Sequence, residues 1–401
     1  MANDNPIGSS GALTGEAFPR LAPLHEQSRQ DTHNSWTRAV LDSAGTAQAQ
    51  DISRRRVTCH MRLWEFVVRR LISAVPILVG LSVLIFFVTH VVPADPARLY
   101  AGFKASPATI EAIRHMLHLD EPLPAQYWYY LVALFHGDLG YSLSIRMPVT
   151  QGIALFLPTT LGLALLTVAW ATPTGITLGI ISAAKKNGLS DALGRGFAYF
   201  GLSVPIFFLA VLLQLIFAVN LKVLPLTGML YPGESLPQRI TGFYPLDSIL
   251  TGDIHSFVSS MIHMILPVLA LGLGEMSLVL RMTRSSMLEI LSSSFIRTLR
   301  AKGIPESAIV FRYAFRAAMG PTLTVVGLSA GGLLGGTLFI EKIFGLSGFS
   351  NWAYQAILGF DYNVVVAFTL IIATTYLFVN IAVDIAYAWI EPQIRLSEEV
   401  V

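Results

Sequence analysis

Apolar residues fall in six long stretches along the chain, and polar segments separate them. Each stretch is close to the roughly 20 residues that an α-helix needs to cross the hydrocarbon core of a bilayer. The pattern therefore predicts six membrane-spanning helices. They cover residues 71–92, 158–181, 197–219, 263–280, 317–344 and 364–390.

The composition agrees with lipid as the surroundings of most of the chain. Hydrophobic residues make up 53% and charged residues 13%, about half the charged share of an ordinary soluble domain. The net charge of +2 is too small for a nucleic-acid footprint, so no nucleic-acid partner is expected. Cys59 is the single cysteine and no HExxH or HxxxH pair occurs, so neither a disulfide nor a metal centre is expected.

Lysine and arginine gather in alternate loops between the predicted spans. Residues 54–70, 185–195 and 281–316 are rich in these cations, whereas the intervening loops hold few. Cytoplasmic loops of membrane proteins carry such an excess. We therefore predict that both termini and the 281–316 segment are cytoplasmic.

The first sixty residues have a different composition. They are rich in Gly, Ser, Ala, Asp and Gln, and they lack apolar periodicity and a continuous apolar run. This composition predicts a disordered cytoplasmic tail at 1–60 rather than a secretory signal peptide. A single transmembrane domain is expected at 61–401.

Residues 281–316 hold seven cations and also an apolar periodicity. Apolar residues recur every four positions before Gly303, and at intervals of four, three and four after it. They are Met287, Leu291, Phe295 and Leu299, then Ile304, Ala308, Phe311 and Phe315. This spacing predicts two short amphipathic helices. Gly303 permits the turn between them, and Pro305 suits the first turn of the second helix.

The periodicity of this hairpin leaves two interpretations open. An apolar face with a cationic rim is typical of a helix lying on anionic lipid. It is equally typical of a docking element that inserts into a groove on a partner protein.

The stretch "RTLRAKGIPESAIVFRYAFRAAMGP" resembles the coupling loop, or EAA loop, of ABC importer permeases of the dipeptide, oligopeptide and nickel type. Other segments similar to this family follow in its order over residues 61–401. They are VPADPARLYAG, HGDLGYSL, ILPVLALGLG, RMTRSSMLEIL, GGLLGGTLFIEKIFGLSGFSNW, FDYNVV and VNIAVDIAYAWIEPQIRL. The resemblance implies an all-α fold with six transmembrane helices, cytoplasmic termini and a cytoplasmic coupling-helix hairpin.

The same resemblance implies a function in the bacterial inner membrane. The chain would form half of a translocation pathway for di- or oligopeptides delivered by an extracytoplasmic binding protein, with nickel and haem as alternative substrates. Its partners would be a second, related permease and two cytoplasmic ATPase subunits or domains. The chain has no GxxxxGK[ST] motif, so ATP and Mg²⁺ would bind those subunits, and this chain would be neither an enzyme nor a cofactor-binding protein.

By resemblance, the ATPase-docking surface lies in the hairpin. Arg297, Thr298, Ala301 and Gly303 would lie at or near the contact, with Arg300 and Lys302 on its rim.

A row of glycines occupies the fifth predicted span. Gly327, Gly331 and Gly335 are spaced by four, which lets helix backbones approach closely. Two interpretations stay open: packing within the bundle, or a contact with the paired permease that moves during gating.

Two carboxylates within the predicted spans are candidate functional groups, because charge is costly to bury in a membrane. Glu275 is a candidate pathway residue or a helix-pairing residue, and Asp384 is expected to be structural. A rival hypothesis is a proton-coupled secondary transporter that uses both. Its expected signature, inverted internal repeats, is not found in the sequence.

Three further features of the external segments carry expectations. Glu341 and Asp361 flank the last external loop and are expected to order it. In that loop GLSG, residues 345–348, matches the GxSG spelling of rhomboid-type serine proteases, but no histidine follows His263 to serve as a base. Ser106 and Pro107 predict the start of an external helix. His118 stands where the family usually has glycine, so a different helix end is expected there.

Overall fold

A computed structural model describes residues 63–91, 97–98, 105–116 and 118–390 of the chain. The tail expected at 1–60, with Cys59, lies outside these residues. The described part is mostly helical, and its one sheet is a β-hairpin of two two-residue strands, in which Tyr141 pairs with Pro148 and Ser142 pairs with Met147.

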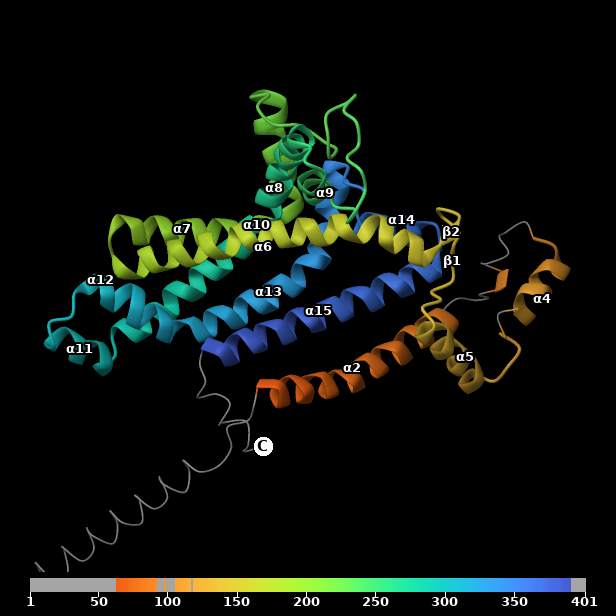
Figure 1. The fold of residues 1–401 in the computed structure, drawn as a ribbon, viewed down its shortest axis with the longest axis horizontal. Helices are drawn as coiled ribbons and strands as arrows, with labels where there is room; N and C mark the ends of the chain where they lie inside the picture. The colour runs from red at the N-terminus through yellow and green to blue at the C-terminus, as the bar shows by residue number, and fades with distance from the viewer. Residues whose placement is uncertain (1–62, 92–96, 99–104, 117, 391–401) are drawn as a thin grey trace, which may run out of the picture. The chain divides into compact units, whose positions relative to one another are not determined.

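Most helices lie along one common direction (Figure 1). The elements, in chain order, are α2 (Leu63–Val91), α4 (Pro107–Met116), α5 (Leu123–Phe135), β1 (Tyr141–Ser142), β2 (Met147–Pro148), α6 (Val149–Ala184), α7 (Leu189–Ser203), α8 (Ile206–Leu213), η1 (Gln214–Asn220), α9 (Tyr244–Thr251), α10 (Ile254–Leu291), α11 (Ser294–Ala301), α12 (Glu306–Ala308), η2 (Ile309–Ala314), α13 (Phe315–Phe344), α14 (Phe349–Leu358) and α15 (Tyr362–Ile390).

Five of the six predicted spans are continuous helices that are long and apolar enough to cross a membrane: α2, α6, α10, α13 and α15. The helices α6 and α10 have 36 and 38 residues, so they are about 54 and 57 Å long. Both are longer than the roughly 30 Å hydrocarbon core of a bilayer. Their ends therefore reach beyond the core.

The third predicted span, over residues 197–219, is not one continuous helix. The chain instead bends by 105° between α7 and the helical segment Ile206–Asn220, and a sixth span exists only if this bent pair is counted as one. Val204, directly before Pro205, has extended backbone angles (φ −86°, ψ 123°). A proline disfavours the helical conformation of the preceding residue and has no N–H to donate, which accounts for the break.

The bundle has two distinct ends. At one end, the hairpin formed by α11, α12 and η2 packs on the last turns of α6 and α10, through a cluster that includes Ile180, Met287 and Ile296. We call this the hairpin end. At the other end, α14 packs on the first turns of α6 and α15, around Val149 and Trp352. The first turns of α2 and the last turns of α15 also lie at the hairpin end (Figure 1).

Contacts between α6 and α10 are close at two glycines. A Cβ atom on Gly175 would lie 2.7 Å from the carbonyl oxygen of Met276, and one on Gly179 would lie 2.9 Å from that of Leu280. These distances are shorter than real Cβ contacts, so only glycine permits this crossing. On the far side of the bundle, α15 packs against α13 and α2, and Arg70 of α2 forms an ion pair with Asp384 of α15 (2.8 Å).

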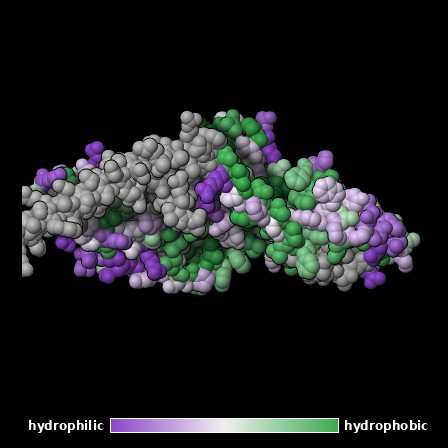
Figure 2. Space-filling view, turned by 90° about the horizontal axis from the view of Figure 1, so that it is seen from below, coloured by the Kyte–Doolittle hydropathy of each residue, from purple (hydrophilic) through white to green (hydrophobic). Residues whose placement is uncertain are grey.

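The outer surface of the bundle is largely apolar. Ile72, Leu84 and Phe87 of α2 are all more than half exposed. Figure 2 shows apolar side chains over the middle of one face, with hydrophilic residues gathered toward its ends. An apolar band between polar ends is the surface that a membrane-spanning protein presents to lipid.

The two ends of α4 follow local capping rules. The Ser106 hydroxyl accepts a hydrogen bond from the Thr109 N–H (3.2 Å), which confirms the predicted start of α4. His118 follows α4 in the left-handed region (φ 53°), a conformation that glycine adopts most readily. Histidine therefore forms the left-handed turn itself, and its ring stacks on Tyr129 at a centroid distance of 4.3 Å.

Candidate functional site: the hairpin and the groups behind it

The turn of the hairpin is a Schellman motif. The Gly303 N–H donates to the Arg300 carbonyl (3.0 Å), and the Ile304 N–H donates to the Leu299 carbonyl (3.3 Å). Gly303 has φ +74°, as the sequence indicated. A Cβ atom there would meet nothing within 4 Å, so the backbone conformation alone requires glycine.

The predicted apolar stripe is only partly buried: Leu299 is buried as predicted, whereas two of its phenylalanines are exposed. Ile296, Leu299 and Ile309 are buried in the cluster at the hairpin end. Phe295 and Phe311 were expected on that apolar face, but they are 50% and 64% exposed. Neighbouring positions on a helix point about 100° apart, so burial of Ile296 turns Phe295 outward.

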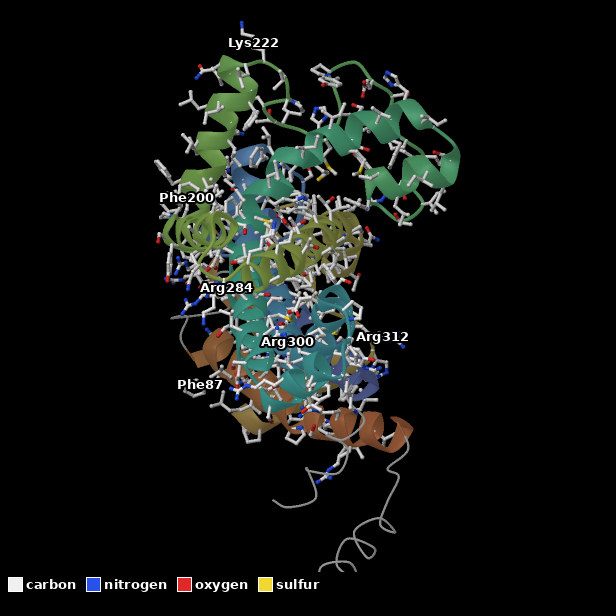
Figure 3. The ribbon with its side chains drawn as sticks, turned by 90° about the vertical axis from the view of Figure 1, so that its left-hand side faces the viewer. Phe87, Phe200, Lys222, Arg284, Arg300 and Arg312 are labelled. Carbon is white, nitrogen blue, oxygen red and sulfur yellow. The ribbon has the colours of Figure 1, made fainter. Side chains whose placement is uncertain are left out.

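Most of the predicted docking residues lie on the exposed side of the hairpin. Arg297, Thr298, Ala301 and Lys302 are all exposed, as is Gly303. Arg300 instead forms a bidentate pair across the turn with Glu306, with N–O distances of 2.6 and 3.0 Å. Because both partners are exposed, the pair fixes the shape of the turn more than its stability. Figure 3 shows Arg300 and Arg312 at the hairpin end, below Arg284.

The three glycines of α13 do not share one contact. A Cβ atom on Gly331 would overlap the ring of Tyr376, and one on Gly327 would lie 2.7 Å from methyl groups of Val383. Both of these partners are on α15 of the same chain. A Cβ atom on Gly335 would meet nothing within 4 Å. Gly327 and Gly331 therefore serve packing within the bundle, and Gly335 faces open space.

Glu275 is buried at 5% exposure in the middle of α10. Its Oε1 atom lies 3.5 Å from the Ser329 hydroxyl, at the limit of a hydrogen bond. Its Oε2 atom has no hydrogen-bond partner among the described residues. The nearest polar groups, Ser329 and Thr172, come from α13 and α6.

Glu341 and Asp361 order the segments around α14, as expected. Glu341 is fully buried, and accepts hydrogen bonds from the Thr160 hydroxyl (2.6 Å) and the Asn351 N–H (2.8 Å). A Cβ atom on Gly348 would overlap the Glu341 carboxylate. The second glycine of GLSG is therefore explained by packing on Glu341. Ser347, directly before this glycine, is exposed.

Asp361 performs a similar function for the β-hairpin. Its Oδ2 atom accepts hydrogen bonds from the Ser142 hydroxyl (2.6 Å) and the Ser144 N–H (2.9 Å). More than 200 residues separate these partners in the chain, so the carboxylate joins β1 to the start of α15.

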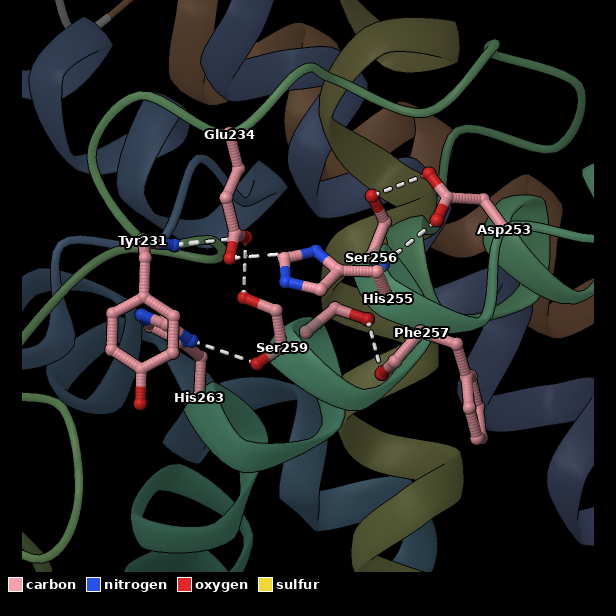
Figure 4. A network of polar contacts seen from close by, with 9 residues as sticks. Tyr231, Glu234, Asp253, His255, Ser256, Phe257, Ser259 and His263 are labelled. Carbon is pink, nitrogen blue, oxygen red and sulfur yellow. Dashed lines mark hydrogen bonds and ion pairs between the residues drawn. The ribbon is translucent and has the colours of Figure 1, made fainter.

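The loop between η1 and α9 is fastened to the start of α10 through Glu234 (Figure 4). The Glu234 carboxylate accepts hydrogen bonds from the Ser259 hydroxyl (2.6 Å) and the Tyr231 N–H (3.3 Å). His255 Nδ1 lies 3.7 Å from the same carboxylate. Within the described residues, no group of three or more His, Cys, Asp or Glu side chains could hold a metal ion.

Five continuous apolar helices and one bent pair, with an apolar exterior, define a multi-pass membrane protein. Residues 175–396 match the family described as "Binding-protein-dependent transport system inner membrane component". Residues 63–164 match the N-terminal part described for such membrane components.

The chain aligns with individual relatives over nearly the whole length of each relative. The "Probable D,D-dipeptide transport system permease protein DdpB" of Escherichia coli (strain K12) is 40% identical over 334 residues, which span 83% of this chain and 98% of that protein. The "Dipeptide transport system permease protein DppB" of Alkalihalophilus pseudofirmus is 38% identical over 330 residues, or 82% and 99%. Among solved structures, inward-facing conformations of the MetNI methionine ABC transporter match with a TM-score of 0.43 and 16% identity, over 58% of this chain and 93% of that chain.

The chain therefore belongs to the family of binding-protein-dependent transport system inner membrane components. It is a permease component of an ABC transporter and a multi-pass protein of the bacterial inner membrane, as its sequence motifs indicated.

Proposed function

We propose that this chain is one of two permease subunits of an ATP-driven importer that carries short peptides delivered by an extracytoplasmic binding protein. Two relatives, 40% and 38% identical, bear names that specify D,D-dipeptides and dipeptides. Each aligns over 98% or more of its length, so the similarity extends through the membrane-spanning helices. Nickel and haem are the alternative substrates.

The exposed side of the hairpin is the observation that supports the ATP-driven part of this proposal. Two large apolar side chains, Phe295 and Phe311, project from a short helical element whose opposite face is anchored in the bundle. Arg297 and Lys302 of the same hairpin are also exposed. A helix with apolar anchors and a charged rim suits a groove on another protein. We assign that groove to a cytoplasmic ATPase subunit, which would bind ATP and Mg²⁺.

The two-ended bundle supports a cytoplasmic position for the hairpin. The first described turn of α2 and the last of α15 lie at the hairpin end (Figure 1). An even number of crossings, with the bent pair α7–η1 counted as one, would place both chain ends and the hairpin on the same side. The excess of cations at that end supports the cytoplasm as this side.

Substitutions at Gly303 test the docking hypothesis. A valine must leave the left-handed region or be strained by about 1–2 kcal/mol, whereas asparagine tolerates that region better than other residues with a side chain. We expect Gly303→Val to lose most of the ATPase that co-purifies with the complex and most of the uptake. Gly303→Asn should retain both. Normal co-purification together with normal uptake in the valine variant would contradict docking through this turn.

An exposed-ring variant separates docking from turn geometry. Phe311→Ala removes a ring from the hairpin surface, and Phe378→Ala removes an equally exposed ring from α15. Only Phe311→Ala should release the ATPase.

Uptake competition identifies the cargo. Cells expressing the complete transporter should accumulate a labelled dipeptide, and an unlabelled dipeptide should compete where Ni²⁺ and haem do not. Uptake should survive a protonophore but not ATP depletion, and Glu275→Gln should leave this pattern unchanged. The opposite sensitivities would favour the proton-coupled alternative through Glu275.

A further inference from the structure

A buried ion pair lies directly behind the hairpin. Asp191, in the first turn of α7, is fully buried, and the Arg284 side chain of α10 is 20% exposed. The guanidinium binds both carboxylate oxygens, with Nε 2.6 Å from Oδ1 and an Nη atom 3.1 Å from Oδ2. Figure 3 shows Arg284 on α10, between α7 and the hairpin.

The Asp191 carboxylate joins more than two helices. It also accepts hydrogen bonds from the Ser182 hydroxyl of α6 (2.7 Å) and from the Asn187 N–H in the turn between α6 and α7 (3.0 Å). The residues that meet at this carboxylate thus come from α6, the turn, α7 and α10. A buried carboxylate that loses its cation is strongly destabilised, so these segments are held together as one unit.

The position of Arg284 connects this unit to the hairpin. Met287, one turn further along α10, is fully buried in the cluster shared by the hairpin and the end of α6. The same α7 leads at its other end into the break at Val204 and Pro205. A displacement of the hairpin therefore reaches α7 through two attachments, one apolar and one ionic.

We propose that Asp191 and Arg284 are positioning residues for transport: their ion pair makes α7 and the α6–α7 turn move with the coupling hairpin, so that ATPase motion reaches the bent helix pair. This inference rests on the proposed function of the hairpin. It goes further because it assigns the transmission of movement to a particular pair outside the docking surface.

Distances between spin labels test the inference without disturbing the pair. In a Cys59→Ser background, labels would be placed at Lys186 in the α6–α7 turn, at Ser307 in the hairpin and at Leu221 after η1, which are all exposed. Between nucleotide-free and ATP-bound complexes, the 186–307 distance should stay constant while the 221–307 distance changes. A change in the 186–307 distance as large as that in the 221–307 distance would overturn the inference.

Paired arginine variants give a functional readout. Arg284→Gln removes the bidentate contact, and Arg281→Gln removes an exposed cation from the same helix three residues earlier. The number of substrates imported per ATP hydrolysed should fall about tenfold or more in Arg284→Gln, because both charge-assisted hydrogen bonds to Asp191 are lost, and should not change in Arg281→Gln. The ATPase should co-purify with both variants.

The outcomes separate the inference from the proposed function. Failure of the ATPase to co-purify with the wild-type chain would reject the proposed function itself. If transport and ATP hydrolysis fall equally in Arg284→Gln, or if neither falls, only the proposed role of the Asp191–Arg284 pair is rejected. If Arg284→Gln does not assemble, the spin-label distances decide.

Discussion

Replacing Gly331 by alanine adds one methyl group at a contact between α13 and α15. The added Cβ atom would overlap the ring of Tyr376, which is only partly exposed and packs across the glycine. Either the ring or the α15 backbone has to move outward. Gly331→Ala should therefore weaken the packing of these two helices.

Gly335 provides a matched control one helical turn further along. Alanine there meets nothing within 4 Å. Both substitutions gain the same helix propensity, about 1 kcal/mol, so this contribution cancels in their comparison. Overpacking costs about 1–3 kcal/mol. The free energy of unfolding should thus be about 1–3 kcal/mol lower in Gly331→Ala than in Gly335→Ala.

Thermal unfolding of the two purified variants in the same detergent measures this difference. Gly335→Ala should unfold at a higher temperature than Gly331→Ala, and uptake per inserted molecule should fall only in Gly331→Ala. A transporter whose states differ by a few kcal/mol would be biased by such a change. Equal unfolding temperatures would refute the reasoning, because they would show that α15 does not press on Gly331.

Two further variants test the local networks. Gly348→Ala should lower the unfolding temperature strongly, because the new methyl group displaces the Glu341 carboxylate from its hydrogen bonds. Each of these bonds costs about 1–3 kcal/mol when it is left unmade. Ser347→Ala, at the neighbouring exposed position, should leave the unfolding temperature unchanged, and equal unfolding temperatures of the two variants would contradict the packing of Gly348 on Glu341. Asp253 caps α10 by accepting hydrogen bonds from Ser256, which hold the pKa of Asp253 below its ordinary value of 3.8. Its stabilisation is therefore complete above pH 3.8 and is lost as the pH falls through the lowered pKa. Asp253→Asn keeps a capping oxygen, so the unfolding temperature of this variant should fall less steeply with decreasing pH than that of the wild type. Parallel curves of unfolding temperature against pH would show that the cap does not titrate.

The number and positions of the spans could be predicted from the sequence, but the full lengths of α6 and α10 and the break in the third span could not. Pro173 and Pro267 also interrupt predicted spans, and both lie inside continuous helices. Pro205 instead ends α7. Each proline removes one backbone hydrogen bond, and whether the chain then bends depends on the neighbouring helices, which the local sequence does not reveal.

The hairpin shows the same division between local and tertiary information. The turn at Gly303 follows from local rules, so it was correctly predicted. The buried face was only partly predicted: Leu299 is buried as expected, but Phe295 and Ile296 are both apolar, and only contact with α6 and α10 selects Ile296. The Asp191–Arg284 pair joins residues 93 positions apart. No spacing rule within one helix indicates such a contact.

The attachments of α6 show how the hairpin can act on the rest of the bundle. At one end, α6 contributes Ile180 to the hairpin cluster, and at the other its Val149 packs beneath α14. Between these ends, Gly175 and Gly179 let its backbone lie directly against α10. Because closely packed helices transmit displacement rather than absorb it, we expect α6 and α10 to respond to the hairpin as one body. The bend between α7 and α8 is then the place in the described bundle where the chain itself can change direction.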